Sequence, residues 1–126
     1  MPKSSEFISR NCYDLTATIA TSGDTSEAVD LGGCSLAGAI LPSTFDGTAF
    51  TLQVSDTLDG VYFDALDNGG NAIGASSNAI GATSIAASRF VSLDTSKTQG
   101  MRFIKIKAGS TQTTTDTIIK LVTRSL

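Results

Sequence analysis

The sequence predicts an all-β fold: a single-domain β-sandwich, jelly-roll-like, of about eight strands. Apolar residues recur at every second position in short runs, and glycine, asparagine, aspartate and serine separate these runs. No segment combines a helix cap with an apolar stripe at helical spacing. A chain of 126 residues has room for one such domain. We expect residues 1–12 to form an N-terminal arm and residues 13–126 to form the sandwich.

The first strands follow directly from this alternation. Apolar residues alternate with polar ones from Leu15 to Ile19, and the turn-forming stretch "SGD" ends the run. Two further runs, 27–33 and 35–41, lead to Pro42. Because proline has no amide hydrogen to donate to a neighbouring strand, we expect the second run to end there.

The most regular segment is "FTLQVSDTLDGVYFDAL", residues 50–66. Apolar residues occupy alternate positions from Phe50 to Val54, and a second apolar run follows at 61–63. The pair Asp59-Gly60 between them is typical of hairpin turns, in which glycine takes a positive φ. We therefore predict a hairpin with a tight, exposed turn at this pair.

The remaining strands are expected at 89–93, 101–109 and 116–124. In the second of these, two isoleucines face away from Lys105 and Lys107, whereas the third has apolar residues on both faces, which predicts a strand covered on both sides. The predicted core consists of Leu15, Ile19, Phe50, Leu52, Val54, Val91, Ile104, Ile106, Ile119 and Leu121.

One internal repeat stands between these strands: "NAIGASS" at 71–77 is followed at once by "NAIGATS" at 78–84. A glycine in each unit disfavours a helix, and an odd period would place Ile73 and Ile80 on opposite faces of a strand. Two interpretations remain, a surface loop made by local duplication and a projecting loop that contacts a partner. The polar stretch 109–116 is expected to be a second loop, and we expect the arm and the loops 68–88 and 109–116 to contact a partner.

Composition excludes several classes of function. The net charge is −3 and the pI is about 4.6, so a basic patch for nucleic acid is not expected. No apolar run is long enough to span a membrane, and the first residues lack a secretory apolar region, which predicts a product made in the cytoplasm and no membrane partner. The chain has no histidine, which removes the common catalytic triads and most zinc sites. We expect no enzyme and no cofactor.

Two residue groups leave alternatives open. Asp56, Asp59, Asp64 and Asp67 could cap the turns beside them, hold Ca²⁺, or share acid–base chemistry. The spacing of these aspartates does not match that of an EF-hand calcium loop. The two cysteines, Cys12 and Cys34, are either small buried thiols or a single disulfide.

The order of several segments is similar to that of another group of proteins. These segments are "VDLGG" at 29–33, "GAILPSTFDGTAFTLQVSDTLDGVYFDAL" at 38–66, "ASRFVSLD" at 87–94, "GMRFIKIKAGS" at 100–110 and "TIIKLV" at 117–122. Together they resemble small β-sandwich virion structural proteins of tailed bacteriophages, over about residues 13 to 124. Their motifs are turns and strands, and no catalytic residue carries over.

This resemblance implies a capsid decoration (cement) protein on the capsid surface of the virion. Such a protein would bind the major capsid protein. It would also bind further copies of itself in a homo-oligomer, and we expect a trimer. The alternative is a tail or head-fibre module that binds a receptor or a glycan, for which Tyr62 and Phe63 could stack on a sugar.

The candidate partner-contact residues are Phe7, Ile8, Ile73, Ile80, Arg89 and Arg102. Phe7 and Ile8 have two interpretations. They either dock on a neighbouring subunit or begin the first strand and cover the domain's own core.

Overall fold

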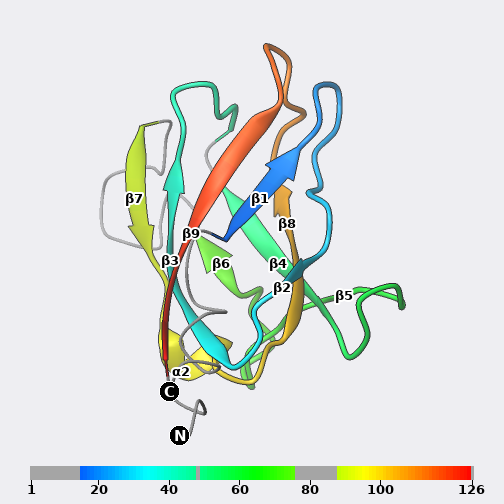
Figure 1. Cartoon of the computed structure of the whole chain (residues 1–126), viewed down its shortest axis with the longest axis vertical. Coiled ribbons are helices and arrows are strands. Elements are labelled where there is room, and N and C mark those ends of the chain that lie inside the picture. Colours follow the sequence, from blue (N-terminus) through cyan, green and yellow to red (C-terminus); the bar gives the residue numbers. More distant parts are fainter. Residues whose placement is uncertain (1–14, 48, 76–87, 126) are drawn as a thin grey trace, which may run out of the picture.

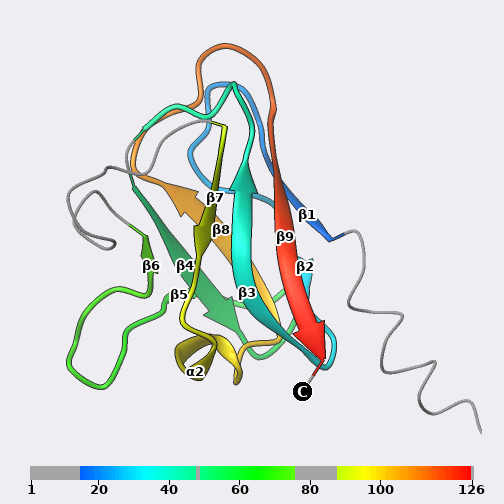
Figure 2. The same ribbon diagram turned by 90° about the vertical axis from the view of Figure 1, so that its left-hand side faces the viewer.

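The computed structural model describes residues 15–47, 49–75 and 88–125, and it consists of two antiparallel sheets packed face to face (Figures 1 and 2). Sheet A has the order β1 (Thr16–Ile19), β9 (Thr117–Ser125), β3 (Cys34–Leu41) and β7 (Arg89–Ser92). Sheet B has the order β2 (Val29–Asp30), β8 (Phe103–Ala108), β4 (Phe50–Ser55) and β5 (Phe63–Asp64), and β6 (Gly74–Ala75) also pairs with β4. The predicted all-β sandwich is confirmed.

Sheet A joins the two ends of the described chain. β1 pairs with β9, so that Ala17 lies opposite Ile119, and β9 pairs in turn with β3. On β3, Ala39 lies between Leu121 of β9 and Val91 of β7. All five side chains are buried. A one-residue slip of any strand would turn its apolar residues outward, so the burial of these residues specifies the register.

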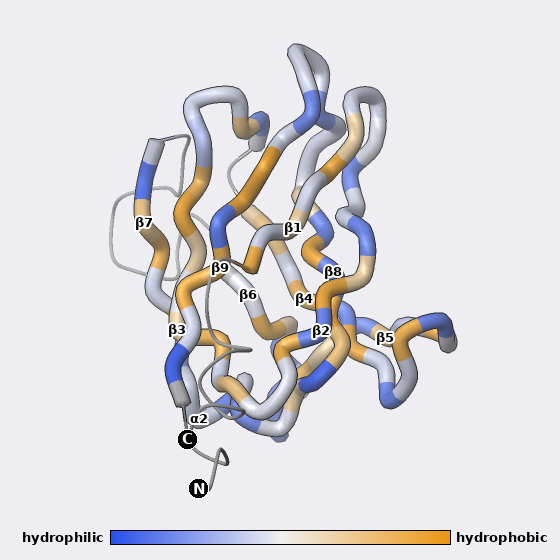
Figure 3. Tube along the Cα trace, viewed as in Figure 1, coloured by the Kyte–Doolittle hydropathy of each residue, from blue (hydrophilic) through white to orange (hydrophobic). Residues whose placement is uncertain are grey.

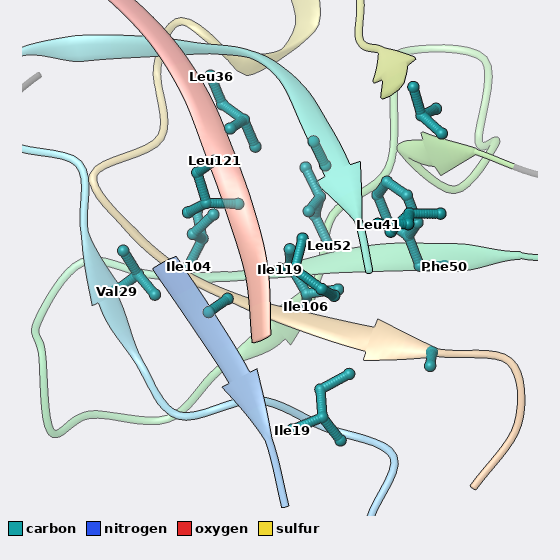
Figure 4. Close-up of a cluster of buried hydrophobic side chains, with 14 of the residues drawn as sticks. Ile19, Val29, Leu36, Leu41, Phe50, Leu52, Ile104, Ile106, Ile119 and Leu121 are labelled. Carbon is teal, nitrogen blue, oxygen red and sulfur yellow. The ribbon is translucent and has the colours of Figure 1, made fainter. Parts of the chain in front are cut away.

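The core lies between the sheets, where side chains of β3 and β9 point toward those of β4 and β8 (Figure 4). Of the ten predicted core residues, eight are buried, and Leu15 and Val54 are partly buried against them. Each fully buried leucine or isoleucine stabilises the fold by roughly 1.5–3 kcal/mol through the apolar surface it removes from water. The predicted core is therefore confirmed in its composition.

Strand β9 departs from the expectation of two covered faces. Ile119 is fully buried, but its neighbour Ile118 is 52% exposed. The alternation along β9 placed its apolar residues correctly on two faces, and only the face toward sheet B is covered by the other sheet. The prediction of a doubly covered strand was wrong for this reason.

The predicted hairpin is present with a different turn. β4 pairs with β5 in antiparallel register, with Val54 opposite Phe63, and residues 56–62 connect them. Gly60 does not have the predicted positive φ, which occurs instead at Gly32, Gly47 and Gly70. A side chain at position 60 would overlap the Thr57 hydroxyl, so glycine is needed there for space rather than for its backbone angle.

The sequence did not predict the one short helix of the described residues. α2 (Thr95–Thr98) is a single turn whose N-cap, Asp94, accepts a hydrogen bond from the amide of Ser96. The hydroxyl of Thr98 is buried and donates to the Leu36 carbonyl at 2.6 Å, which attaches α2 to sheet A. A helix of this length shows no apolar periodicity in the sequence.

Two further observations concern membrane-spanning helices and the two cysteines. No helix within 15–47, 49–75 and 88–125 is long and apolar enough to cross a membrane. Cys34 is buried and disulfide-bonded, so the interpretation as a free thiol was wrong for this residue. Cys12 lies outside the described residues.

Candidate partner-binding surfaces

The structure separates the predicted contact residues. Arg89 is exposed on β7 at the edge of sheet A, and Arg102 is exposed immediately before β8 of sheet B. Ile73 is only 9% exposed, its amide donates to the Ala65 carbonyl, and its carbonyl accepts from the Leu52 amide. It therefore belongs to the core rather than to a contact surface. The other three candidates, Phe7, Ile8 and Ile80, lie outside the described residues.

The aspartates of the proposed acidic cluster have different surroundings. Asp67 Oδ1 accepts hydrogen bonds from the amides of Gly69 and Asn71, and Oδ2 lies 3.3 Å from Lys97 Nζ. The Asn71 amide bond is the main cause of a lowered pKa at Asp67, with burial opposing it and Gly69 and Lys97 adding to it. Asp67 thus caps its own turn, as one of the three hypotheses predicted.

The other members of that cluster are exposed. Asp64 accepts a hydrogen bond from Gln53 Nε2 at 3.1 Å, and Asp56 and Asp59 lie in the connection between β4 and β5. Within the described ranges, no three cysteine, aspartate or glutamate side chains come together in a way that could hold a metal ion.

The connection between β4 and β5 forms the first candidate surface. We call residues 56–66 the hairpin arm, and in Figure 1 this segment extends sideways from the sandwich. Four large apolar side chains of the hairpin arm are exposed: Leu58, Val61, Phe63 and Leu66. Phe63 is 66% exposed although it lies opposite Val54, a residue that packs against the core. Hydrophobic and hydrophilic residues therefore lie side by side along the arm (Figure 3).

The second candidate surface is the outer side of sheet A. We use the name sheet A face for Ile40, Phe90, Ile118 and Lys120, all of which are exposed. Ile40 pairs with Phe90 on one side and with Lys120 on the other, and Ile118 is the next outward residue of β9. Three large apolar side chains thus gather around one lysine.

Gly38 explains how Phe90 lies on this face. A side chain at position 38 would come within 2.6–2.7 Å of two atoms of the Phe90 ring and 2.8 Å of the Val91 carbonyl. One side of the Phe90 ring therefore covers the backbone of Gly38, and the other side of the ring faces solvent. Phe90 is 56% exposed.

A groove and two aromatic rings lie where β4 of sheet B ends and β8 begins. The groove is lined by Val54, Ser55, Asp56, Phe63, Gly100 and Arg102. The Arg102 guanidinium lies 4.9 Å from the centre of the Phe103 ring, and Lys105 Nζ lies 4.6 Å from the centre of the Tyr62 ring. One face of each ring is therefore occupied by a cation.

Arg102 also forms a surface ion pair with Asp30, at 3.2 Å. Burial alone would raise the pKa of Asp30, but hydrogen bonds from Arg102 and from the Gly32 amide, together with the guanidinium charge, hold that pKa below its usual range. Because both partners are about half exposed, the pair contributes little to stability.

Loop 109–116 contains a residue whose role the sequence did not indicate. Gln112 is fully buried, and its side-chain amide bonds to Asp46, Ser110 and Thr117. Its backbone bonds to the turn at Ser22 and Gly23. Gln112 therefore joins three loops at the same end of the sandwich, its own and that of Asp46 through the side chain and the turn at Ser22 and Gly23 through the backbone. The loop that was expected to contact a partner is anchored through this residue.

Parts of the two surfaces could be recognised in the sequence. The apolar residues on the outer side of β9 were visible in the alternation, and so were those of the hairpin, but neither pattern says which residues stay uncovered. A glutamine within a run of threonines gave no signal for Gln112.

Comparisons with known proteins found no protein-family model, no curated protein and no solved structure that matches this chain. The similarity to phage virion proteins therefore stays a prediction. The surfaces described above can bind other macromolecules through apolar contact, with charged residues at their borders to set orientation.

Proposed function

We propose that the chain is a capsid decoration (cement) protein of a tailed bacteriophage, a homo-oligomer that binds the major capsid protein on the virion surface. One observation carries this proposal: a small sandwich exposes large apolar side chains on two separate surfaces, the hairpin arm and the sheet A face. Exposed apolar residues that gather in one place on a soluble protein mark an interaction surface, whereas scattered single ones do not. The resemblance in the order of segments supports the same function.

The physical requirements of decoration fit these surfaces. A decoration protein needs a rigid body and contacts that can be repeated over a symmetric shell, where avidity multiplies weak individual contacts. It does not need a deep pocket. A trimer is the first oligomer to test, because it was the one that the resemblance implied.

The strand order supports a jelly-roll form of the sandwich. With β6 set aside, one sheet has the order β1-β9-β3-β7 and the other β2-β8-β4-β5. Each sheet combines early strands with late ones, which is the arrangement that two Greek-key units produce.

The alternative function, binding of a glycan or receptor by a tail or head-fibre module, has less support. Sugar binding of this kind needs open aromatic faces, and cations already lie over one face of Tyr62 and of Phe103. Phe63 is the more open ring, but it lies among apolar and acidic residues of the hairpin arm.

The experiment that tests decoration mixes the purified full-length chain with undecorated heads and measures co-sedimentation. We expect saturable binding and a copy number in purified virions on the order of hundreds. A version lacking residues 1–10 tests the N-terminal anchor separately, because wild-type occupancy by this version would refute an anchoring role. If the full-length chain does not bind heads, the decoration proposal is wrong.

A further inference from the structure

The charged residues of the hairpin arm are all acidic. Asp56, Asp59 and Asp64 are exposed, and the segment 56–66 contains no lysine or arginine. The two ion pairs of the described ranges join Lys97 to Asp67 and Arg102 to Asp30, so neither includes an aspartate of the arm. The cations nearest to the arm belong to the body of sheet B: Lys105 lies over the Tyr62 ring, and Arg102 lines the groove beside Asp56. The hairpin arm is therefore an apolar surface with a negative border.

The charged residues of sheet A are all basic. Its four strands contain Arg89, Lys120 and Arg124 and no aspartate or glutamate. All three are exposed, and neither ion pair includes them. This distribution is unexpected in a chain whose net charge is −3. The sheet A face is thus an apolar surface with a positive border.

The two surfaces are complementary in apolar character and in charge. We propose that the hairpin arm of one copy docks on the sheet A face of a second copy. In this contact Val61 and Phe63, which are 70% and 66% exposed, cover Ile40, Phe90 and Ile118. The aspartates of the arm then lie beside Lys120 and Arg124, which alternate onto the same outward side of β9 as Ile118, and the opposite charges orient the encounter and exclude other registers.

The contact is heterologous, because the arm belongs to sheet B and the receiving face to sheet A. Each bound pair keeps one free arm and one free face, so the assembly either closes into a ring or extends as a chain. The contact rests on the self-association in the proposed function and names the surfaces that make it. It needs no phage head, so it can be tested on the purified chain alone.

The test reverses the charge of each surface in turn. The arm variant carries Asp56→Lys and Asp59→Lys, and the face variant carries Lys120→Glu and Arg124→Glu. We expect the wild-type chain to associate at about 0.1 mM by sedimentation velocity, and each variant alone to associate at least about tenfold more weakly. An equimolar mixture of the two variants should regain association, since each then finds a surface of opposite charge on the other.

Two controls separate this contact from general charge effects and from unfolding. Lys107→Glu changes an exposed lysine on the outer side of sheet B and should leave association unchanged. Thermal melting of each variant should stay near that of the wild type, because all of the altered side chains are exposed. Val61→Ser should weaken association several-fold without any change of charge.

A monomeric wild-type chain at about 1 mM would overturn the contact, and so would variants that associate as the wild type does. Failure of the mixed variants to associate would also overturn it. These results are independent of head binding, because a chain that self-associates through these surfaces can still fail to bind a phage head, and the converse also holds.

Discussion

Replacing Gln112 by alanine removes the buried side-chain amide that joins loop 109–116 to the loop of Asp46. The amide nitrogen donates to the Asp46 and Ser110 carbonyls at 2.9 and 3.1 Å. The amide oxygen accepts from the Asp46 amide and from the Thr117 hydroxyl at 2.9 and 2.8 Å. In the variant these four partners lose their bonds together.

The cost differs among the partners because they differ in access to water. Thr117 is fully buried, so its hydroxyl would stay unsatisfied at a cost of about 1–3 kcal/mol. The Asp46 and Ser110 groups lie in partly buried or exposed loops, where water can replace part of the lost bonding. We expect the free energy of unfolding to fall by about 3 kcal/mol in total.

Urea unfolding followed by far-UV circular dichroism measures this change as a shift of the midpoint at constant slope. Gln112→Glu has nearly the same volume but presents an oxygen to the two carbonyls, so at neutral pH a similar loss is expected if hydrogen bonds rather than packing matter. Thr114→Ala, in the same loop and exposed, is the matched control and should change stability by less than about 0.5 kcal/mol. A loss below about 1 kcal/mol for Gln112→Ala would refute the assigned role.

Three other predictions follow from the same structure. Gly74→Ala should destabilise the fold by about 2 kcal/mol or more. The new methyl group would overlap the Phe50 carbonyl and lie 2.7 Å from the Thr51 Cα, and these backbone atoms cannot move aside. Unchanged stability in urea would contradict this prediction. Gly60→Ala should cost about 1 kcal/mol or less, since the Thr57 side chain can rotate away, and the cost should vanish in a Thr57→Ala background; a cost that persists there would point to backbone strain instead. The backbone amide of Asn71 is the main cause of the lowered pKa of Asp67, and the backbone amide of Thr21 is the main cause of the lowered pKa of Asp116. Both carboxylates therefore stabilise the folded state above the unfolded pKa of about 3.9, and this contribution is lost as the pH falls through the lower folded pKa. The urea midpoint should be flat from about pH 5 to 7 and fall below about pH 4, less steeply in Asp67→Asn.

Much of the fold could be predicted because alternation is a local property of the chain. Period two places Ile104 and Ile106 on one face and Lys105 and Lys107 on the other, whatever strand lies beside them. The same reasoning predicted β3, β4 and β7 within a residue or two. The hairpin was predictable as well, because β4 and β5 are close in sequence and need only a short connection.

Long-range features were not predictable from one sequence. No local pattern indicates that β1 pairs with β9 or that Cys34 is disulfide-bonded. The absence of a positive φ at Gly60 depends on how Thr57 and Ser55 approach it, and the burial of Gln112 depends on three loops that are distant in sequence. Each of these features is decided by a contact partner that the local residues do not specify.

The candidate surfaces show the same division. The alternation of residues is enough to place Ile118 and Ile119 on opposite sides of a strand and to show that apolar residues continue through the hairpin arm. The packing of the two sheets is needed to show that Ile119 is covered and Ile118 is not, and that Phe63 lies beyond the cover of the core. The physical reason is that alternation assigns each side chain to a face, whereas burial depends on which element, if any, packs against that face.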